Sequence, residues 1–203
     1  MKKILLAVAV LSFAVIGCGP KHTVINAGQL NACLKDAPAW VLAGGAEGGL
    51  SAVGSAKLSN AGLNFTRSEA LANGRDELAR VMQVKVENMF KNFTQTTGIG
   101  DKETVDKVVS NVSRQIASQT ISGSKQAEVW VSECNELFVL VVADAPAIEK
   151  EIKAQAVSSY RNEQALWQQI QAKNALKEMD EAIKSTMNTP NNQLEGYQNN
   201  TNR

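Results

Sequence analysis

The sequence is short of the residues that build metal centres and nucleic-acid interfaces. It has one histidine and three cysteines in 203 residues, and aromatic side chains make up 5% of it. Basic and acidic residues nearly cancel, at 21 Lys and Arg against 20 Asp and Glu. A protein that binds nucleic acid usually has a basic patch or a high pI. We therefore expect no metal site and no nucleic-acid partner, and the length indicates one folded domain with tails.

Motifs of known catalytic chemistry are also missing. The chain contains no H-E-x-x-H, no C-x-x-C and no nucleophile elbow. The single histidine, His22, lies in a polar spacer, where a solvated side chain is the ordinary case. The glycines of residues 42–49 match neither the dinucleotide-binding pattern nor a phosphate-binding loop, and they indicate a flexible turn. We expect no enzymatic activity, no catalytic residue and no bound cofactor apart from covalent lipid.

The first residues have the pattern of a bacterial lipoprotein signal. Lys2 and Lys3 precede a largely apolar run, residues 4–16. This run is shorter than the ~20 apolar residues that a transmembrane helix needs. It ends at Val-Ile-Gly-Cys, which resembles the lipobox, where a small residue precedes the cysteine that receives lipid. We expect residues 1–17 to be removed and Cys18 to be lipidated; the alternative is a secretory signal with a chance cysteine.

Lipid on Cys18 would hold the protein at a membrane surface through several acyl chains, each buried CH₂ contributing ~0.8 kcal/mol. An Asp after the cysteine retains some bacterial lipoproteins in the inner membrane, so Gly19 favours the outer membrane. Loss of Lys2 and Lys3 leaves 19 basic and 20 acidic residues, which indicates no particular electrostatic partner. We expect an outer-membrane protein that faces the periplasm or the cell surface, with residues 18–36 as lipidated N-terminus and spacer.

Two cysteines, Cys33 and Cys134, remain once Cys18 carries lipid. Beyond the inner membrane the compartment is oxidising, and two leftover cysteines there favour a disulfide. Such a bridge would close a loop of ~100 residues, which is worth ~4–5 kcal/mol in the chain-entropy treatment. The alternative, two free thiols, stays open, because the sequence does not show whether the two Cα atoms lie close enough.

The first half of the body predicts a strand and a long helix. Trp40, within Ala-Pro-Ala-Trp-Val at 37–41, is a candidate core anchor, and Leu50–Leu58 is interpreted as a strand. Thr66 and Glu69 have capping-box spacing, which predicts a helix that begins there. An apolar stripe at helical spacing comprises Leu71, Leu78, Met82, Val86, Met89 and Phe93. The basic residues of this helix are interpreted as a mostly solvated face: Arg67, Arg75, Arg80, Lys85 and Lys91.

The second half predicts another helix and a hairpin. A helix from about Lys102 has one apolar face, made of Val105, Val108, Val109, Val112 and Ile116. Glu128–Val131 and Leu137–Ala143 are typical of strands, with a turn at 132–135 between them, and Trp130 is a second candidate core anchor. The later strand is apolar on both faces, as in a central strand covered by helices. The expected fold class is α+β: a small antiparallel sheet of about three strands packed against long helices, with an extended C-terminal helix.

The C-terminal part predicts a helix that begins at Asp144 and Pro146. If it continued to Met187 it would span ~60 Å, against ~30 Å for a domain of this size. It therefore either projects, inviting a second copy or an envelope protein as partner, or breaks near Ser158-Ser159 and folds back; both alternatives stay open. The expected organisation is an α+β domain at 37–157, a projecting amphipathic helix at 158–187 and a disordered tail at 188–203.

Four segments occur in a recognisable order: Ala37-Pro38-Ala39-Trp40-Val41, Val53-Gly54-Ser55-Ala56, Gly74-Arg75-Asp76-Glu77-Leu78-Ala79-Arg80 and the Phe138–Val142 strand. Together with the lipobox they resemble the Lpp-twenty lipoprotein family, which includes FlgP-like flagellar lipoproteins, over roughly residues 30–155. Gly74 departs from the pattern, since an alanine commonly precedes the arginine. The resemblance implies an α+β domain displayed at the outer membrane and gives no active site. Some members assemble around the flagellar motor, and others are surface antigens or proposed adhesins.

Two functions are therefore expected. The first is structural: an anchored subunit that self-assembles or scaffolds an envelope machine, with the flagellum as one candidate. The alternative is a surface-exposed binding module, an adhesin or antigen.

Overall fold

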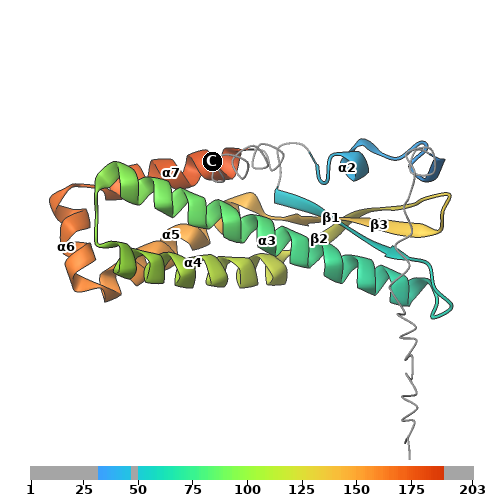
Figure 1. The fold of residues 1–203 in the computed structure, drawn as a ribbon, viewed down its shortest axis with the longest axis horizontal. Helices are drawn as coiled ribbons and strands as arrows, with labels where there is room; N and C mark the ends of the chain where they lie inside the picture. Colours follow the sequence, from blue (N-terminus) through green and yellow to red (C-terminus); the bar gives the residue numbers. More distant parts are fainter. Residues whose placement is uncertain (1–31, 47–49, 190–203) are drawn as a thin grey trace, which may run out of the picture.

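The computed structural model describes residues 32–46 and 50–189 of the chain. Three strands form one antiparallel sheet, and helices pack beside it (Figure 1). This arrangement confirms the α+β fold class that the sequence predicted. In chain order the elements are α2 (Ala39–Leu42), β1 (Leu50–Lys57), α3 (Leu63–Thr97), α4 (Lys102–Gly123), β2 (Lys125–Val131), β3 (Glu136–Ala143), α5 (Ala145–Asn162), α6 (Gln164–Ala172) and α7 (Leu176–Asn188).

Strand β3 lies at the centre of the sheet, as its apolar pattern predicted. The strand order is β1-β3-β2, and both pairings are antiparallel. Helix α3 covers one face, where Leu137, Val139 and Val141 of β3 are buried. Because side chains alternate along a strand, Phe138 points to the opposite face. Strand β2 is an edge strand whose residues are exposed or half-buried.

Helix α3 approaches β1 closely because small residues line the contact. A methyl group on Gly54 would overlap the carbonyl oxygen of Ala70 and the backbone nitrogen of Gly74. A methyl group on Gly74 would lie 2.6 Å from Cγ2 of Val141. The two glycines therefore face each other across the contact between α3 and β1. The atoms nearest to Gly54 belong to the backbone of α3, not to side chains.

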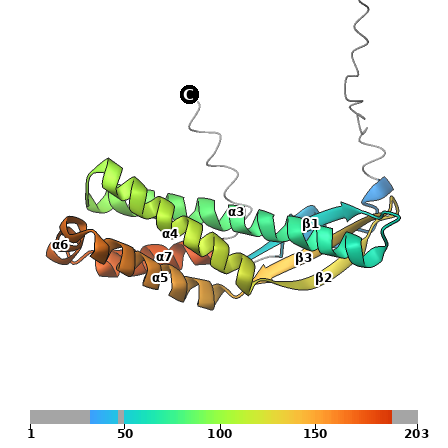
Figure 2. The same cartoon turned by 90° about the horizontal axis from the view of Figure 1, so that it is seen from below.

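Helix α3 runs nearly the whole length of the molecule (Figure 1). Its 35 residues span ~52 Å. The sheet lies beside its first half, and α4, α5 and α7 lie beside its second half (Figure 2). The helical half has its own cluster of buried side chains, which includes Phe90, Ile116 and Ile152. One continuous helix thus belongs to both halves of the fold.

The capping box predicted at Thr66 and Glu69 is wrong, because the residue that caps α3 is Gly62, four residues before Thr66. Gly62 precedes the helix with a φ of 92°, a conformation that favours glycine. Leu63 is the first helical residue, and the Thr66 hydroxyl donates to the Gly62 carbonyl from within the first turns. Spacing alone did not distinguish a Thr at the cap from a Thr inside the helix.

The C-terminal segment folds back on the domain, so the expected projecting helix at 158–187 is corrected to three separate helices. The first break falls at Glu163, a few residues after the Ser158-Ser159 pair, which is the alternative break site in the sequence. The second break contains Asn174, which has a φ of 51°. An apolar stripe along residues 164–188 is buried in the helical cluster, where it contributes Leu166, Ile170, Met179, Ile183 and Met187.

Lys173, at the turn between α6 and α7, holds this segment on the end of α3. Its Nζ donates to the carbonyl oxygens of Thr97 and Gly98, at 2.6 and 3.0 Å. Gly100 nearby donates its backbone N–H to Oε1 of Gln169 at 2.7 Å. The last carbonyls of a helix lack internal partners and attract cations. The ammonium group of Lys173 therefore stabilises the C-terminal end of α3.

Lys85 is the exception to the solvated basic face predicted for α3. Its side chain is only 2% exposed, and its Nζ donates to the carbonyl oxygen of Thr189, just past the end of α7, at 2.6 Å. Burial lowers the pKa of Lys85 from its ordinary value of 10.5. The tail expected to be disordered at 188–203 lies outside the described residues, apart from Asn188 and Thr189.

Candidate functional site at the disulfide-linked end

The candidate site is the end of the sheet where the N-terminal segment joins the domain. Cys33 and Cys134 form a disulfide, with Cα atoms 5.2 Å apart. Cys134 is exposed in the turn between β2 and β3, and Cys33 is half-buried. Cys18, the expected lipidation site, and the spacer residue His22 lie outside the described residues. The structure therefore fixes the start of the domain to the central hairpin by a covalent bond.

The turn that presents Cys134 is built by its polar neighbours. Asn135 has a φ of 58°, a conformation that asparagine tolerates better than most residues. Ser132 donates its N–H to the Glu136 carbonyl at 2.8 Å, which closes the turn. The carbonyl of Asn135 accepts from the N–H of Leu58 at 2.8 Å, which links the hairpin turn to the end of β1. The end of the sheet is thus one connected unit.

Trp40 is buried, but it lies outside the two main clusters of buried side chains. Its indole Nε1 donates to Oε2 of Glu128 on β2 at 2.9 Å. Trp40 therefore fastens α2 and the lead-in segment to the edge of the sheet, and it does not fill the centre of the fold.

Trp130 is not a core residue, which corrects the prediction from the sequence. It is half-buried on the edge strand β2, and it pairs in register with Phe138 of β3. The two rings pack with centroids 5.4 Å apart on the sheet face opposite α3. A tryptophan in a strand pattern can pack on a covered or an uncovered face of a sheet. The sequence did not show that β2 would be an edge strand.

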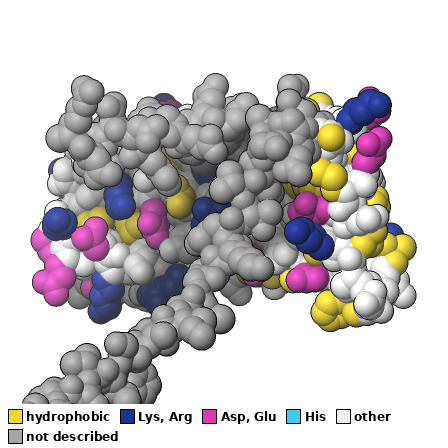
Figure 3. All heavy atoms as spheres, turned by 45° about the vertical axis from the view of Figure 1, so that its right-hand side comes forward, with side chains coloured by type: hydrophobic (Ala, Val, Ile, Leu, Met, Phe, Trp, Pro, Cys, Tyr) yellow, Lys and Arg dark blue, Asp and Glu magenta, His cyan; other side chains and the backbone are white. Residues whose placement is uncertain are grey.

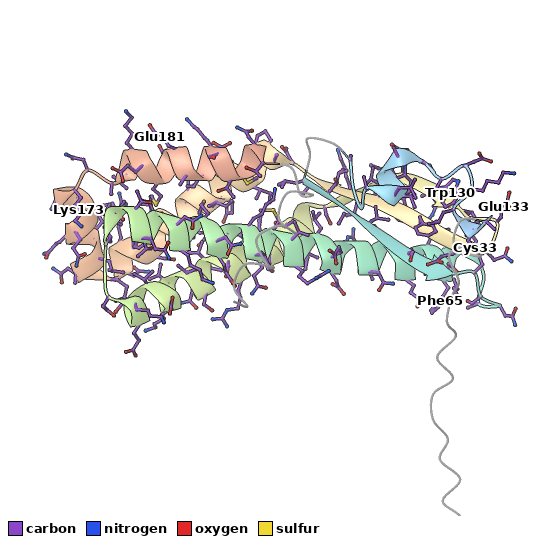
Figure 4. The ribbon with its side chains drawn as sticks, turned by 45° about the horizontal axis from the view of Figure 1, so that its top comes forward. Cys33, Phe65, Trp130, Glu133, Lys173 and Glu181 are labelled. Carbon is purple, nitrogen blue, oxygen red and sulfur yellow. A yellow bond between two sulfur atoms is a disulfide. The ribbon has the colours of Figure 1, made fainter. Side chains whose placement is uncertain are left out.

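Exposed apolar side chains gather at the same end. The described part of the chain has seven large exposed hydrophobic side chains, and four of them belong to this end: Leu58, Leu63, Phe65 and Val131. Phe65 is 56% exposed and Leu63 is 55% exposed. Figure 3 shows hydrophobic side chains on the surface of this end, and Figure 4 shows Phe65, Cys33 and Glu133 together there. Leu63 and Phe65 precede the predicted apolar stripe of α3, and nothing in the residue pattern marks them as a surface patch.

A shallow pocket of about 330 Å³ lies between α5 and α7. Its charged side chains come from both helices, and Lys153 of α5 donates to Oδ2 of Asp180 of α7 at 2.6 Å. These groups join the two helices to each other. The described residues include no cluster of three or more potential metal-ligating side chains, and none of the helices there is long and apolar enough to span a membrane.

One hydroxyl in the helical half has no hydrogen-bond partner among the described residues. Tyr160 of α5 is fully buried, and its ring packs near those of Phe90 and Phe93, at 6.1 and 6.4 Å between centroids. Burial raises the pKa of Tyr160 to about 12, although nearby Thr94 opposes the shift. The Thr94 hydroxyl itself donates to the Phe90 carbonyl at 2.8 Å.

Comparison with known proteins now identifies the family. A search of curated proteins found no match. A family model described as LPP20 lipoprotein matches residues 38–144, which is just over half of the chain. The matched region begins just before α2 and ends after β3, so it contains the whole sheet together with α3 and α4. The chain belongs to the LPP20 lipoprotein family.

Proposed function

We propose that this lipoprotein is anchored in the outer membrane by lipid on Cys18 and has a structural or scaffolding role in the envelope. Membership of a lipoprotein family supports the anchor, as does the run of Lys2, Lys3, apolar residues and Val-Ile-Gly-Cys. Gly19 after the modified cysteine supports the outer membrane. The flagellum is the machine we propose for the scaffold.

The observation that carries the structural role is the way the domain is attached. The Cys33–Cys134 bridge joins the tethered segment to one end of the sheet, and α3 extends from that end for ~52 Å. Lys173 and Lys85 hold the returning helices along the second half of α3. An elongated unit that is tethered at one end suits a spacer or a mount between a membrane and a larger assembly.

The partner of this scaffold meets a surface other than the apolar stripe of residues 164–188. That stripe is already covered within the chain, so we do not propose self-assembly through it. A second copy or another envelope protein therefore binds the polar outer faces of the helices or the end of the sheet.

Swimming of a deletion strain in soft agar tests the proposal. We expect swimming to be lost, to return with the wild-type gene, and to stay lost with Cys18→Ala, which is exported but has no thiol to modify. Mass spectrometry of the two complementing proteins gives the control, because only the wild type should gain acyl mass. Normal swimming of the deletion strain would contradict the flagellar role, and protease shaving of intact cells would then test the surface-exposed adhesin or antigen.

A further inference from the structure

We propose that the exposed apolar patch at the disulfide-linked end, formed by Leu58, Leu63 and Phe65, contacts the surface of the bilayer that holds the lipid anchor. The inference rests on the proposed anchor at Cys18. It adds an orientation: the end of the sheet faces the membrane, and the turn between α6 and α7 is the distal end.

The first argument is the position of the patch relative to the tether. Fourteen residues separate Cys18 from Cys33, and even fully extended they reach only ~50 Å. Cys33 is bonded to Cys134 in the hairpin turn, and the N–H of Leu58 donates to the neighbouring Asn135. The tether therefore holds the patch itself near the bilayer, at the high effective concentration that a short linker gives.

The second argument is the chemistry of the patch. Leu63 and Phe65 are more than half exposed at the beginning of α3, and exposed apolar groups of this kind mark interaction sites. Lys57 and Arg67 flank them and are also exposed, and the first carboxylate of α3 is that of Glu69, which is exposed one turn after Phe65. Apolar groups between cations match the acyl boundary and the phosphates of a lipid surface.

The opposite side of the same end is less suited to the contact. Glu133 is exposed in the hairpin turn, and Asp36 is exposed beside Lys35 in the lead-in segment. Figure 4 shows Glu133 and Phe65 on different sides of this end. The patch at the start of α3, rather than the whole end, is therefore the part that meets the bilayer.

A fluorescent probe on the full lipidated protein tests the orientation. In that protein Cys18 is modified and the other two cysteines are bonded, so Phe65→Cys introduces a single free thiol for an NBD label. The protein is reconstituted into vesicles of phosphatidylethanolamine and phosphatidylglycerol. Leu176→Cys is the matched control, because Leu176 is also exposed and lies at the start of α7, near the distal end.

We expect the probe at 65 to gain intensity and shift to shorter wavelength in vesicles, and to lose that gain when doxyl-labelled lipid is included. The probe at 176 should show neither change. A protein that floats with the vesicles while its probe at 65 stays as water-exposed as the probe at 176 would overturn the contact alone. Failure to float would overturn the anchor and the contact together. A gain that follows protein density and resists doxyl quenching would indicate a second copy on the patch and would also overturn the contact.

Discussion

The Nζ of Lys85 and the carbonyl oxygen of Thr189 lie 2.6 Å apart, although 104 residues separate them in the sequence. The contact places a buried cation at the negative end of α7. It complements Lys173, which binds the carbonyls at the end of α3. Each of two neighbouring helices thus has its C-terminal end held by a lysine, one from α3 itself and one from the turn before α7.

The stability of the protein should rise with pH in the alkaline range because of Lys85. Burial lowers its pKa below 10.5 in the folded state, so between the lowered pKa and 10.5 the unfolded chain binds more protons than the folded chain. The free energy of unfolding therefore increases as pH rises through that range. Urea denaturation at several pH values up to about 10 should show the increase in wild type and not in Lys85→Met.

Lys173→Met is the matched control for that experiment. Lys173 also binds helix carbonyls, but it is exposed, so its substitution removes a comparable lysine–carbonyl contact without removing a buried lysine. An equal loss of pH dependence in both variants would show that Lys85 is not its source.

Tyr160→Phe should stabilise the protein by about 1 kcal/mol at neutral pH. The substitution removes a buried hydroxyl that has no hydrogen-bond partner among the described residues, and it keeps the ring between Phe90 and Phe93. Chemical denaturation of the two proteins side by side measures the difference. A loss of stability would mean that the hydroxyl has a partner after all, either the nearby Thr94 hydroxyl or a buried water.

The same tyrosine gives a second pH dependence with the opposite sign. Burial raises the pKa of Tyr160 to about 12, so between pH 10 and 12 the folded chain keeps a proton that the unfolded chain has lost. The free energy of unfolding should then fall by about 1.4 kcal/mol per pH unit. Tyr160→Phe should lack this component of the fall, and an unchanged slope in the variant would contradict the assignment.

Gly54→Ala should destabilise the domain more than Gly74→Ala does. The new methyl group at 54 meets backbone atoms of Ala70 and Gly74, which move only if α3 shifts away from β1. Overpacking of this kind costs about 1–3 kcal/mol or more. At 74 the methyl group meets the Val141 side chain, and alanine recovers about 1 kcal/mol of helix propensity. Thermal unfolding compares the two, and equal melting temperatures would argue against the close contact.

Loss of the disulfide should weaken the attachment of the lead-in segment. The bridge links residues 101 apart, and the entropy of closing such a loop is worth about 4–5 kcal/mol. Cys33→Ser with Cys134→Ser should therefore lower the urea midpoint and expose Trp40, which hydrogen-bonds Glu128 on β2. Trp40→Phe in the disulfide-bonded protein is the control, since it removes the hydrogen bond and part of the buried ring while the covalent link stays. A midpoint unaffected by the double substitution would show that packing alone holds the segment.

Local patterns predicted much of the fold. The spacing of Met82, Val86 and Phe93 follows from the helical period, and all three are buried. The apolar run of β3 predicted a central strand, and β3 is indeed paired on both sides, with α3 over one face. Both predictions depend on residues close together in the sequence, because the period of a helix or a strand determines which side chains share a face.

Periodicity along the chain does not predict contacts between segments that are distant in the sequence. No Pro or Gly marks the break at Glu163. At the second break Asn174 is a residue type that tolerates a positive φ, and this was the local signal there. Lys85 looks like any other basic residue of a helix, and its burial depends on where α7 ends. Trp130 was misassigned because its strand lies at the edge of the sheet, a property set by pairing rather than by composition.

The bridge between Cys33 and Cys134 also determines how the domain would carry tension. A pull on the segment before Cys33 enters the fold at the hairpin turn, since the covalent bond bypasses α2 and the loop that follows it. Strand β3 leads from that turn along the long axis and is paired on both sides (Figure 1). The hydrogen bonds between β3 and β1 are then loaded together in shear rather than opened one after another, so the packing of α2 does not by itself limit the strength of the attachment.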